Sequence, residues 1–379
     1  MNSNKRSVIF LPNLSGTGGG AEIYCLNLAC VLKEEGCEVF IITDRCEGDE
    51  DNVRSTLKMY GMPDFKVLYI EDSAVSGKDR FLERMTERED LQHREIEALL
   101  KKYDVGLFIN GTFGNLCGFE GLHNWHIVHF PPKPAENPLY MEHIREYLGS
   151  YEHFLCNSSF TARWFKTYYG QEAEVLYPPV NAEGIKTEDL AAKENMILTC
   201  GRITPAKKLR EMAHAFGCLY ASGIRDYRFV IAGLLDPRRE EYADLLRSDL
   251  KNLPAEIVTD LPREELNAYF RRAKFYWHAM GLGVQEDNPL KMEHFGMTSA
   301  EALTFGCVPI VIDRGGQKEI VTPETGCRFS TEEELVNFTA DLIRDPKKTY
   351  MLACNALKRA ERYSMDRFRA EIRRYLNSV

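Results

Sequence analysis

The sequence contains no hydrophobic run that approaches the ~18 residues of a membrane-spanning helix. Its first residues, Met1 to Arg6, also lack the apolar core of a secretory signal peptide. We therefore expect neither a membrane anchor nor export, and we predict a soluble protein of the cytoplasm.

Basic residues are too few for a general nucleic-acid binder, whose binding surface is basic. Lys and Arg number 48 against 57 Asp and Glu, which gives a formal net charge of −9. We therefore expect no nucleic-acid partner. Any substrate phosphate has to be met by a few local cations.

No Cys-x-x-Cys pair occurs among the 11 cysteines, and Cys200 and Cys307 lie in apolar segments, so reduced and buried thiols are expected. No set of His, Cys, Asp and Glu has the spacing of metal ligands. The Asp-x-Asp triplet at residues 49–51 lies in an acidic segment that we predict as a loop. The sequence thus implies no metal ion and no other cofactor.

A chain of 379 residues, 44% of them hydrophobic, is long enough for two cores, since single cores stop growing near ~250–300 residues. The first part begins with a βαβ pattern: a strand at residues 8–11, an amphipathic helix at 21–35 and a strand at 38–43. A charged helix or helix pair and three strands follow, expected at residues 78–103, 105–110, 126–130 and 154–157. These elements predict a doubly wound α/β sheet.

A proline-rich joint at residues 177–181 separates this part from a second parallel set of strands. These strands are expected at residues 196–200, 229–232, 256–258, 275–278 and 308–312. A last helix is expected at residues 365–376, with Ser364 as its N-cap. We therefore predict domains at residues 1–180 and 181–360 and a C-terminal helical segment at 361–379.

The most informative segment runs from Glu293 to Glu301, two carboxylates separated by seven residues. A Phe-Gly turn at residues 295–296 leads into a short helix at 298–305, which Gly306 ends. A helix N-terminus offers free amides and the positive end of the helix dipole. The segment therefore predicts a site for an anionic or hydroxyl-rich ligand, with Glu293 accepting hydrogen bonds from it.

Two cations follow the strand predicted at residues 196–200. Arg202 can bind two phosphate oxygens with its planar guanidinium, and Lys207 adds a point charge five residues later. Their position between a strand and a helix favours a diphosphate clamp over a merely solvated pair of charges.

A glycine-rich loop at residues 16–21, with Asp44 at the end of the next strand, imitates a dinucleotide-binding fingerprint. The spacing argues against a nicotinamide site, because residues 12–15 separate the loop from the first strand. A tight turn is one alternative. The density of glycine favours instead a close approach of the backbone to a ligand.

These motifs resemble, in order and over most of the chain, those of the retaining glycosyltransferases of family 4. The His-Phe-Gly at residues 294–296 is similar to the branch with the α-1,2-mannosyltransferase of the dolichol-linked oligosaccharide and with bacterial polysaccharide mannosyl- and hexosyltransferases. The resemblance implies the GT-B fold. Two Rossmann-like, doubly wound parallel-sheet domains would face each other across a cleft, and the C-terminal helix would cross back to the N-terminal domain.

The resemblance also implies how the donor is held. Gly18 and Gly19 would approach the donor diphosphate from the N-terminal domain, while Arg202 and Lys207 would clamp it. Lys208 stands where the family usually has glycine, which puts the local turn geometry in doubt. Glu293 would grip the sugar hydroxyls, and the backbone amides that line the same site would be those of Phe295, Gly296, Met297 and Thr298.

Glu301 has two interpretations. The resemblance implies that it binds the ribose hydroxyls of the nucleotide. Thr298 to Glu301 also reads as a capping box, in which Glu301 would bond back to the Thr298 amide and serve only the helix.

His129 is expected near the donor sugar, because it stands at the end of an N-domain strand and its His-Phe-Pro string matches the branch. His126 is the competing candidate, since a histidine on an apolar strand is often structural. His278 and His294 are expected to support the site without touching the ligand. The expected catalytic residues are then His129, Glu293, Arg202 and Lys207.

The activity implied is transfer of a hexose, with mannose favoured, to a hydroxyl of a glycan or glycolipid acceptor. The attack would be front-face, with the leaving phosphate taking the acceptor proton. GDP-mannose is favoured as donor over a UDP-hexose. The helix at residues 79–103 could touch anionic lipid at a membrane surface, but its mixed charge favours a solvated face. A nicotinamide oxidoreductase and a non-catalytic sugar-nucleotide binding protein are the alternatives.

Overall fold

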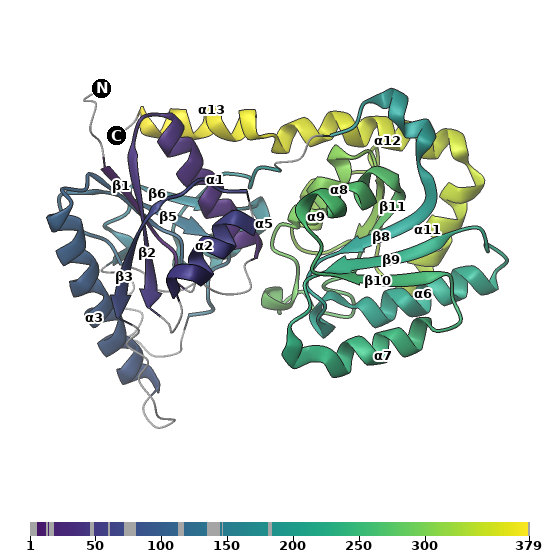
Figure 1. Cartoon of the computed structure of the whole chain (residues 1–379), viewed down its shortest axis with the longest axis horizontal. Coiled ribbons are helices and arrows are strands. Elements are labelled where there is room, and N and C mark those ends of the chain that lie inside the picture. The colour runs from purple at the N-terminus through teal and green to yellow at the C-terminus, as the bar shows by residue number, and fades with distance from the viewer. Residues whose placement is uncertain are drawn as a thin grey trace. The chain divides into compact units, whose positions relative to one another are not determined.

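The computed structural model describes residues 6–12, 14, 19–45, 49–59, 61–71, 81–112, 117–134, 145, 147–180 and 184–377. The chain divides into two compact units, one of Met1–Tyr177 with Phe368–Val379 and one of Pro178–Arg367 (Figure 1). Each unit is built around one parallel sheet.

The first unit contains a seven-stranded sheet in the order β3-β2-β1-β4-β5-β6-β7, with every described pair parallel. Its strands are β1 (Arg6–Phe10), β2 (Glu38–Arg45), β3 (Lys66–Glu71), β4 (Leu107–Asn110), β5 (His123–Val128), β6 (His153–Cys156) and β7 (Glu174–Val175). Its helices include α1 (Gly20–Glu34), α2 (Asp49–Met59), α3 (Phe81–Lys102) and α5 (Ser159–Tyr169). The acidic triplet at residues 49–51 therefore begins α2, and the prediction of a loop there was wrong.

The second unit contains a six-stranded sheet in the order β10-β9-β8-β11-β12-β13. Its strands are β8 (Glu194–Cys200), β9 (Arg228–Gly233), β10 (Ala255–Thr259), β11 (Ala273–His278), β12 (Val308–Ile312) and β13 (Cys327–Phe329). Its α-helices are α6 (Leu209–Ala221), α7 (Glu240–Leu250), α8 (Arg263–Arg272), α9 (Met297–Thr304), α10 (Gln317–Ile320), α11 (Glu332–Arg344) and α12 (Pro346–Ala360). Short 3-10 helices in the described part of this unit are η1 (Thr187–Ala192), η2 (Pro205–Lys207), η3 (Pro237–Arg239), η4 (Pro289–Lys291) and η5 (Glu361–Tyr363).

The central strands of both sheets are buried on their two faces. In β8, Ile197 packs into one cluster with α6, α7, α11 and α12, while Met196 and Leu198 pack into another with Phe270 of α8 and Phe305 beyond α9. Successive strand residues point to opposite faces, so strands covered by helices on both sides are apolar throughout. The predicted fold class, two Rossmann-like parallel-sheet domains, is confirmed. The cleft between them stays a prediction.

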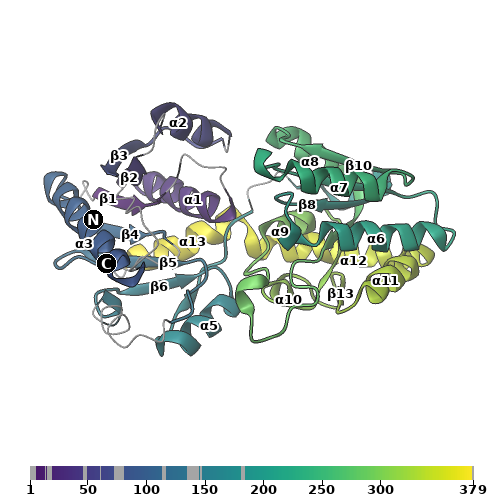
Figure 2. The same ribbon diagram turned by 90° about the horizontal axis from the view of Figure 1, so that it is seen from below.

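The C-terminal helix α13 (Met365–Leu376) is the helix predicted at residues 365–376, and Ser364 Oγ accepts a hydrogen bond from Arg367 N at 3.2 Å. From Phe368 onward the helix belongs to the first unit, where it lies beside α1 and β5 (Figure 2). The ring of Tyr375 lies 5.9 Å from that of Trp125, and Arg369 forms an ion pair with Glu34 at 2.7 Å.

The long helix α3 turns a hydrophobic stripe to the core, because Ile96 and Leu100 are buried with residues of β1 and β2. For residues 91–102, this arrangement agrees with the favoured interpretation of the helix predicted at residues 79–103, in which one face is solvated and the other faces the core. In the part of the chain that the structure describes, no helix is long and apolar enough to cross a bilayer.

Candidate functional site

The predicted donor residues gather where the strand order of the second sheet reverses. β8 and β11 are neighbours, and from them the chain runs outward in opposite directions, to β9 and to β12. Open α/β sheets bind ligands at this point, outside the carboxyl ends of the strands. Lys207 follows the end of β8, and His278 is the last residue of β11.

Glu293 is the centre of this group. Its Oε2 atom accepts hydrogen bonds from Lys207 Nζ at 2.5 Å and from His278 Nε2 at 3.0 Å. Burial alone would raise the pKa of Glu293, but the Lys207 charge and the two hydrogen bonds outweigh burial and hold this pKa well below its usual value. Glu293 is therefore an anion at neutral pH.

The histidines beside Glu293 are neutral. Burial lowers the pKa of His278, and it lowers the pKa of His294 to about 4. His278 Nε2 then carries the proton that it donates to Glu293, which fixes the tautomer of the ring. His278 thus orients the carboxylate and adds no charge to the site.

The start of α9 presents backbone amides. Gly296 is the N-cap with a left-handed φ of 107°, and the first helical bonds run from Ser299 N and Ala300 N to Gly296 O. The amides of Met297 and Thr298 precede these bonds and have no acceptor within the helix. The Thr298 hydroxyl accepts a hydrogen bond from Tyr276 at 2.7 Å, which holds this turn against β11.

Gly315 and Gly316, which follow β12, pack against the backbone of the same turn. Gly316 N donates to Glu293 O at 2.8 Å. A Cβ atom on Gly315 would stand 2.2 Å from Glu293 O, and one on Gly316 would stand 2.3 Å from His294 O. Only glycine can lie this close to the carbonyl oxygens of Glu293 and His294, so the backbone after β12 fixes the position of the Glu293 backbone.

Glu301 does not form the capping box that was the alternative for it. The helix begins at Met297, so the cap is Gly296 and not Thr298, and this interpretation was wrong. Glu301 Oε1 instead pairs with Arg263 Nη1 at 2.8 Å. The ribose assignment stays a prediction.

Arg202 and Lys207, the two residues predicted to bind phosphate, both follow β8 but differ in their contacts. Arg202 is exposed and makes no hydrogen bond or ion pair with any residue that the structure describes. Lys207 is engaged by Glu293. Lys208 adopts the left-handed conformation, with φ 59° and ψ 37°, which glycine adopts most readily.

The predicted residues of the first unit are described there by themselves. Gly18 lies outside the described residues. Gly19 is the N-cap of α1, and its amide donates to Glu22 Oε2 at 2.7 Å. This amide already has an anionic acceptor in the free protein.

His129 lies one residue beyond β5 and is almost fully buried. Its Nε2 lies 3.0 Å from Gly111 O and 3.7 Å from Cys25 Sγ. The competing His126 lies inside β5, 3.2 Å from Asn110 O, and burial lowers its pKa to about 3. His126 therefore has the environment of a structural, neutral histidine.

Sequence models of two glycosyltransferase families match the chain. The model described as Glycosyltransferase Family 4 matches residues 18–183, and the one described as Glycosyl transferases group 1 matches residues 181–359. The chain is a glycosyltransferase of the family 4 type. The group 1 match contains every predicted donor residue of the second unit.

Curated relatives of this glycosyltransferase include two proteins named GDP-Man:Man(3)GlcNAc(2)-PP-Dol alpha-1,2-mannosyltransferase. The Dictyostelium discoideum protein is 22% identical over 232 residues, which are 57% of this chain and 44% of that protein. The Neurospora crassa protein is 26% identical over 209 residues, 51% of this chain and 36% of that protein. The matches span less than half the length of either relative.

Solved structures share the fold of this glycosyltransferase over nearly its whole length. Anabaena HepE, in complex with UDP and glucose, has a TM-score of 0.67 at 14% identity and covers 99% of this chain and 100% of its own. The sucrose-phosphate synthase of Thermosynechococcus elongatus has a TM-score of 0.72 at 15% identity, and the match covers 99% of this chain and 98% of the synthase chain. At these identities the likeness shows the fold alone.

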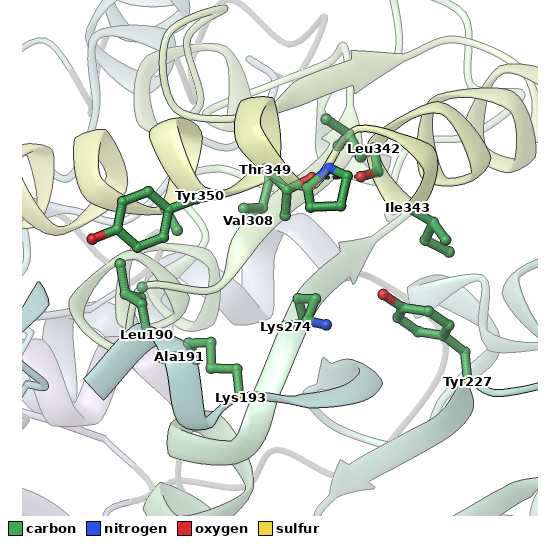
Figure 3. A pocket seen from close by; sticks show the side chains of 13 residues that line it. Leu190, Ala191, Lys193, Tyr227, Lys274, Val308, Leu342, Ile343, Thr349 and Tyr350 are labelled. Carbon is green, nitrogen blue, oxygen red and sulfur yellow. Dashed lines mark hydrogen bonds between the residues drawn. The ribbon is translucent and has the colours of Figure 1, made fainter. Parts of the chain in front are cut away.

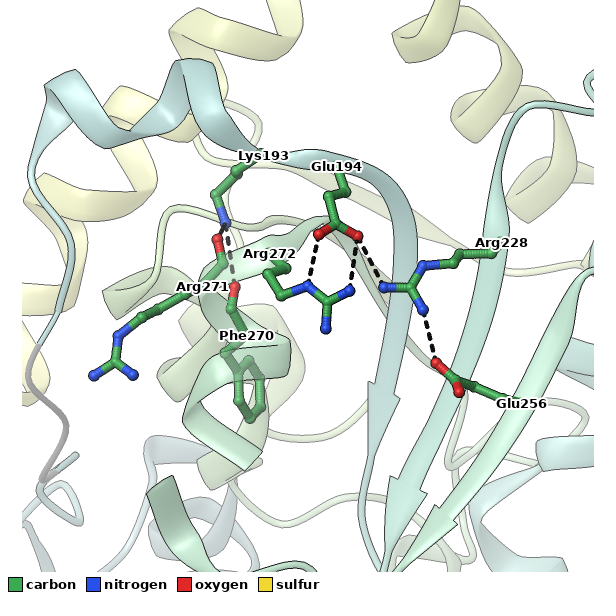
Figure 4. A network of polar contacts seen from close by, with 7 residues as sticks. All are labelled: Lys193, Glu194, Arg228, Glu256, Phe270, Arg271 and Arg272. Atoms are coloured by element: carbon green, nitrogen blue, oxygen red, sulfur yellow. Dashed lines mark hydrogen bonds and ion pairs between the residues drawn. The ribbon is translucent and has the colours of Figure 1, made fainter. Parts of the chain in front are cut away.

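A pocket of about 180 Å³ lies at the opposite edge of the second sheet, where β8, β11 and β12 begin (Figure 3). None of the predicted site residues lines it. Lys193 at its wall donates to Phe270 O, Arg271 O and Ala273 O at 3.2, 3.3 and 2.6 Å, so its ammonium caps the end of α8 (Figure 4). We therefore place the candidate site of the glycosyltransferase at Glu293 and not at this pocket.

The charges around Lys193 also bind one another. Glu194 pairs with Arg272 at 2.6 Å and with Arg228 at 2.8 Å, and Arg228 pairs with Glu256 at 2.8 Å (Figure 4). This chain of ion pairs joins the amino ends of β8, β9 and β10 to α8. Its role is structural.

Sequence reasoning missed two residues of the site. Tyr276 precedes His278 by two positions in β11, and the alternation of a strand gives both the same face, a signal that could have found it. Arg263, the partner of Glu301, begins a helix that is distant in sequence. No local pattern marks it.

Proposed function

We propose that the chain transfers a hexose, with mannose favoured, from a nucleoside-diphosphate sugar to a hydroxyl of a glycan or lipid-linked acceptor. The observation that carries this proposal is the cluster of Lys207, Glu293 and His278 beside the amides that open α9. It joins a cation for phosphate, an ionised acceptor for sugar hydroxyls and a helix N-terminus at one switch point.

In the proposed binding mode, Arg202 and Lys207 hold the diphosphate, while Gly18 and Gly19 approach it from the first unit. Glu293 and the amides of residues 295–298 hold the sugar. Glu301 binds the ribose hydroxyls with its second carboxylate oxygen, since Oε1 already pairs with Arg263.

We propose GDP-mannose as the favoured donor. The names of the relatives specify GDP-mannose, although these proteins are matched over less than half of their length. UDP, which accompanies the HepE structure, makes a UDP-hexose the second candidate. The acceptor class rests on the same relatives, whose names specify a dolichol-linked glycan.

The proposed reaction is a front-face displacement with retention. The bond between the anomeric carbon and the phosphate oxygen breaks, and its electron pair stays on the phosphate. The acceptor oxygen bonds to the anomeric carbon from the same face and gives its proton to that phosphate oxygen. Lys207 and Arg202 stabilise the charge that develops on the leaving group, and losing one such contact typically costs ~3–4 kcal/mol. His129 is proposed to lie near the sugar.

The decisive experiment tests binding, slow hydrolysis and transfer with GDP-mannose, UDP-glucose and UDP-galactose. We expect one donor to bind and to be hydrolysed slowly by the wild-type protein. Lys207→Ala should bind that donor about tenfold or more weakly and should hydrolyse it more slowly than wild type. Proton NMR of the sugar first released or transferred reports whether the anomeric configuration is kept. A donor that binds but is neither hydrolysed nor transferred to any acceptor offered would support a non-catalytic binding protein instead.

A nicotinamide oxidoreductase is not favoured, because both family models that match the chain belong to glycosyltransferases. A melting shift with NAD but not with GDP or UDP would reverse this choice.

A further inference from the structure

Gln317 is a polar side chain in an interior position next to the candidate site. It begins α10, directly after the two glycines that support Glu293, and it is 0% exposed. Neither its Oε1 nor its Nε2 atom has a hydrogen-bond partner among the residues that the structure describes. Buried carboxamides are normally hydrogen-bonded, so this one requires an explanation.

The carboxamide lies against the turn that carries Glu293. A Cβ atom built on Gly296 would stand 2.1 Å from Gln317 Nε2 and 3.4 Å from Glu293 Cγ. The end of Gln317 and the side chain of Glu293 therefore meet at Gly296. A residue with a Cβ atom at position 296 would collide with the carboxamide, so glycine is what lets Gln317 lie against this turn.

A structural role explains this position poorly. Burying an amide without hydrogen bonds opposes folding, whereas methionine of similar length and shape would fill the same space without that cost. Shape therefore does not require a glutamine here. An amide that gains its hydrogen bonds when a ligand arrives accounts for both the residue type and the position.

The chemistry of the neighbouring groups specifies the ligand. A carboxylate such as Glu293 only accepts hydrogen bonds, so it takes the proton of a sugar hydroxyl and leaves the oxygen lone pairs of that hydroxyl unused. Gln317 Nε2 is a donor and can fill them. Lys207 and the neutral His278 already donate to Glu293, so Gln317 supplies an uncommitted N–H beside the carboxylate.

We propose that Gln317 is a sugar-binding residue that helps to select the donor hexose. Its Nε2 donates to the same hydroxyl whose proton Glu293 accepts. A hexose with the opposite configuration at that carbon loses both hydrogen bonds at once. This inference rests on the proposed function, because it needs a nucleotide sugar in the site.

The test compares Gln317→Met with wild type, since methionine keeps the shape and removes the amide. Gln317→Glu is the second variant, because it keeps an acceptor and removes the N–H donor. Gln92→Met is the matched control: Gln92 is a buried glutamine of the first unit that donates to Asp44 at 3.3 Å. The measurements are kcat/KM for GDP-mannose, UDP-glucose and UDP-galactose, the dissociation constants of GDP and UDP, and the melting temperature.

We expect Gln317→Met to lower kcat/KM for the preferred donor about tenfold and to reduce its preference over the other hexoses by a similar factor. The affinity for the nucleoside diphosphate and the melting temperature should stay at the wild-type values. Gln317→Glu should lose the same preference, and Gln92→Met should keep it.

An unchanged donor preference in Gln317→Met would overturn this inference alone. So would an equal loss for the sugar donor and the bare diphosphate, or a preference that falls only in step with the melting temperature. If wild type binds no nucleotide or nucleotide sugar, both the proposed function and this inference are wrong.

Discussion

Replacing Glu293 by glutamine should raise the affinity for the nucleoside diphosphate and lower the turnover of the sugar donor. In the free protein Lys207 Nζ lies 2.5 Å from Glu293 Oε2, so a diphosphate has to compete with a carboxylate for this cation. Glutamine removes the charge and keeps the shape, and its oxygen can still accept from His278. GDP or UDP should therefore bind Glu293→Gln more tightly than wild type.

The size of the gain follows from the exposure of the pair. A hydrogen bond between charged groups contributes ~1.5–3 kcal/mol. Solvent screens part of this, since the side chains of Lys207 and Glu293 are 20% and 19% exposed. We take the lower end, ~1.5 kcal/mol, which is about tenfold in a dissociation constant. Turnover should fall ~100-fold or more, because the sugar loses its ionised acceptor.

Isothermal titration with GDP and UDP, together with initial rates, measures both effects. Glu286→Gln is the matched control, because Glu286 is 83% exposed and pairs with Arg314 at 3.3 Å without touching the cluster. It should change neither quantity. A diphosphate affinity that stays equal or becomes weaker in Glu293→Gln would refute the competition for Lys207 on which the reasoning rests.

Four further predictions concern the same fold and site. Lys207→Ala and Arg202→Ala should each weaken binding of the nucleoside diphosphate about tenfold or more and hardly change that of the nucleoside, because only the phosphates meet these charges; equal losses in calorimetry would contradict the clamp. Glu301→Gln should weaken donor binding about tenfold, since an amide offers one good acceptor where a carboxylate offers two, while the melting temperature changes little; a donor dissociation constant equal to that of wild type would show that Glu301 serves only its pair with Arg263. Activity should survive EDTA, because fixed cations and the helix dipole take the place of a divalent ion, and a loss that Mg²⁺ or Mn²⁺ restores would reveal a metal site. His126 has a pKa of about 3 in the folded protein, below its ordinary value of about 6.5, so the unfolded chain binds the extra proton and stability falls by about 1.4 kcal/mol per pH unit as the pH drops from 6.5 toward 3. Urea titrations of His126→Phe should therefore show a pH dependence of stability that is smaller by about half a proton at pH 6.5 and by about one proton at pH 5, and an identical pH dependence would mean that His126 takes up its proton equally in the folded and unfolded states.

The sequence predicted those parts of the fold whose signals are local. The βαβ start, the strands β8 to β12 of the second sheet and α13 each combine an apolar period with a clear end signal, such as Gly36 after α1 and Ser364 before α13. β5 begins three residues and ends two residues earlier than predicted, and its predicted end was too late because the apolar run continues through Phe130 after the strand has ended. The strands β3, β7 and β13 were also not predicted. β7 and β13 have only two and three residues, which is too short for a periodic pattern.

The parts of the site that lie in one sequence segment could be predicted. Contacts between segments that are distant in sequence could not. Glu293 and the helix start share a single motif, and Lys207 follows its strand directly. Lys208 in the left-handed conformation, which costs about 1 kcal/mol for a residue other than glycine, could not be foreseen from residue type. Nor could the pair of Arg263 with Glu301, because only the packing of α8 beside α9 brings the two side chains together.

The position of α13 determines how this enzyme could be recombined with a relative. Its last part, Phe368–Val379, packs within the first unit through Tyr375 and the Arg369–Glu34 ion pair, although it follows the second unit in the chain. A chimera with one crossover near Tyr177 would join a foreign first unit to a helix shaped for another surface. Exchange of the first unit therefore calls for two crossovers, one after Tyr177 and one before Phe368, so that the helix travels with the sheet on which it lies.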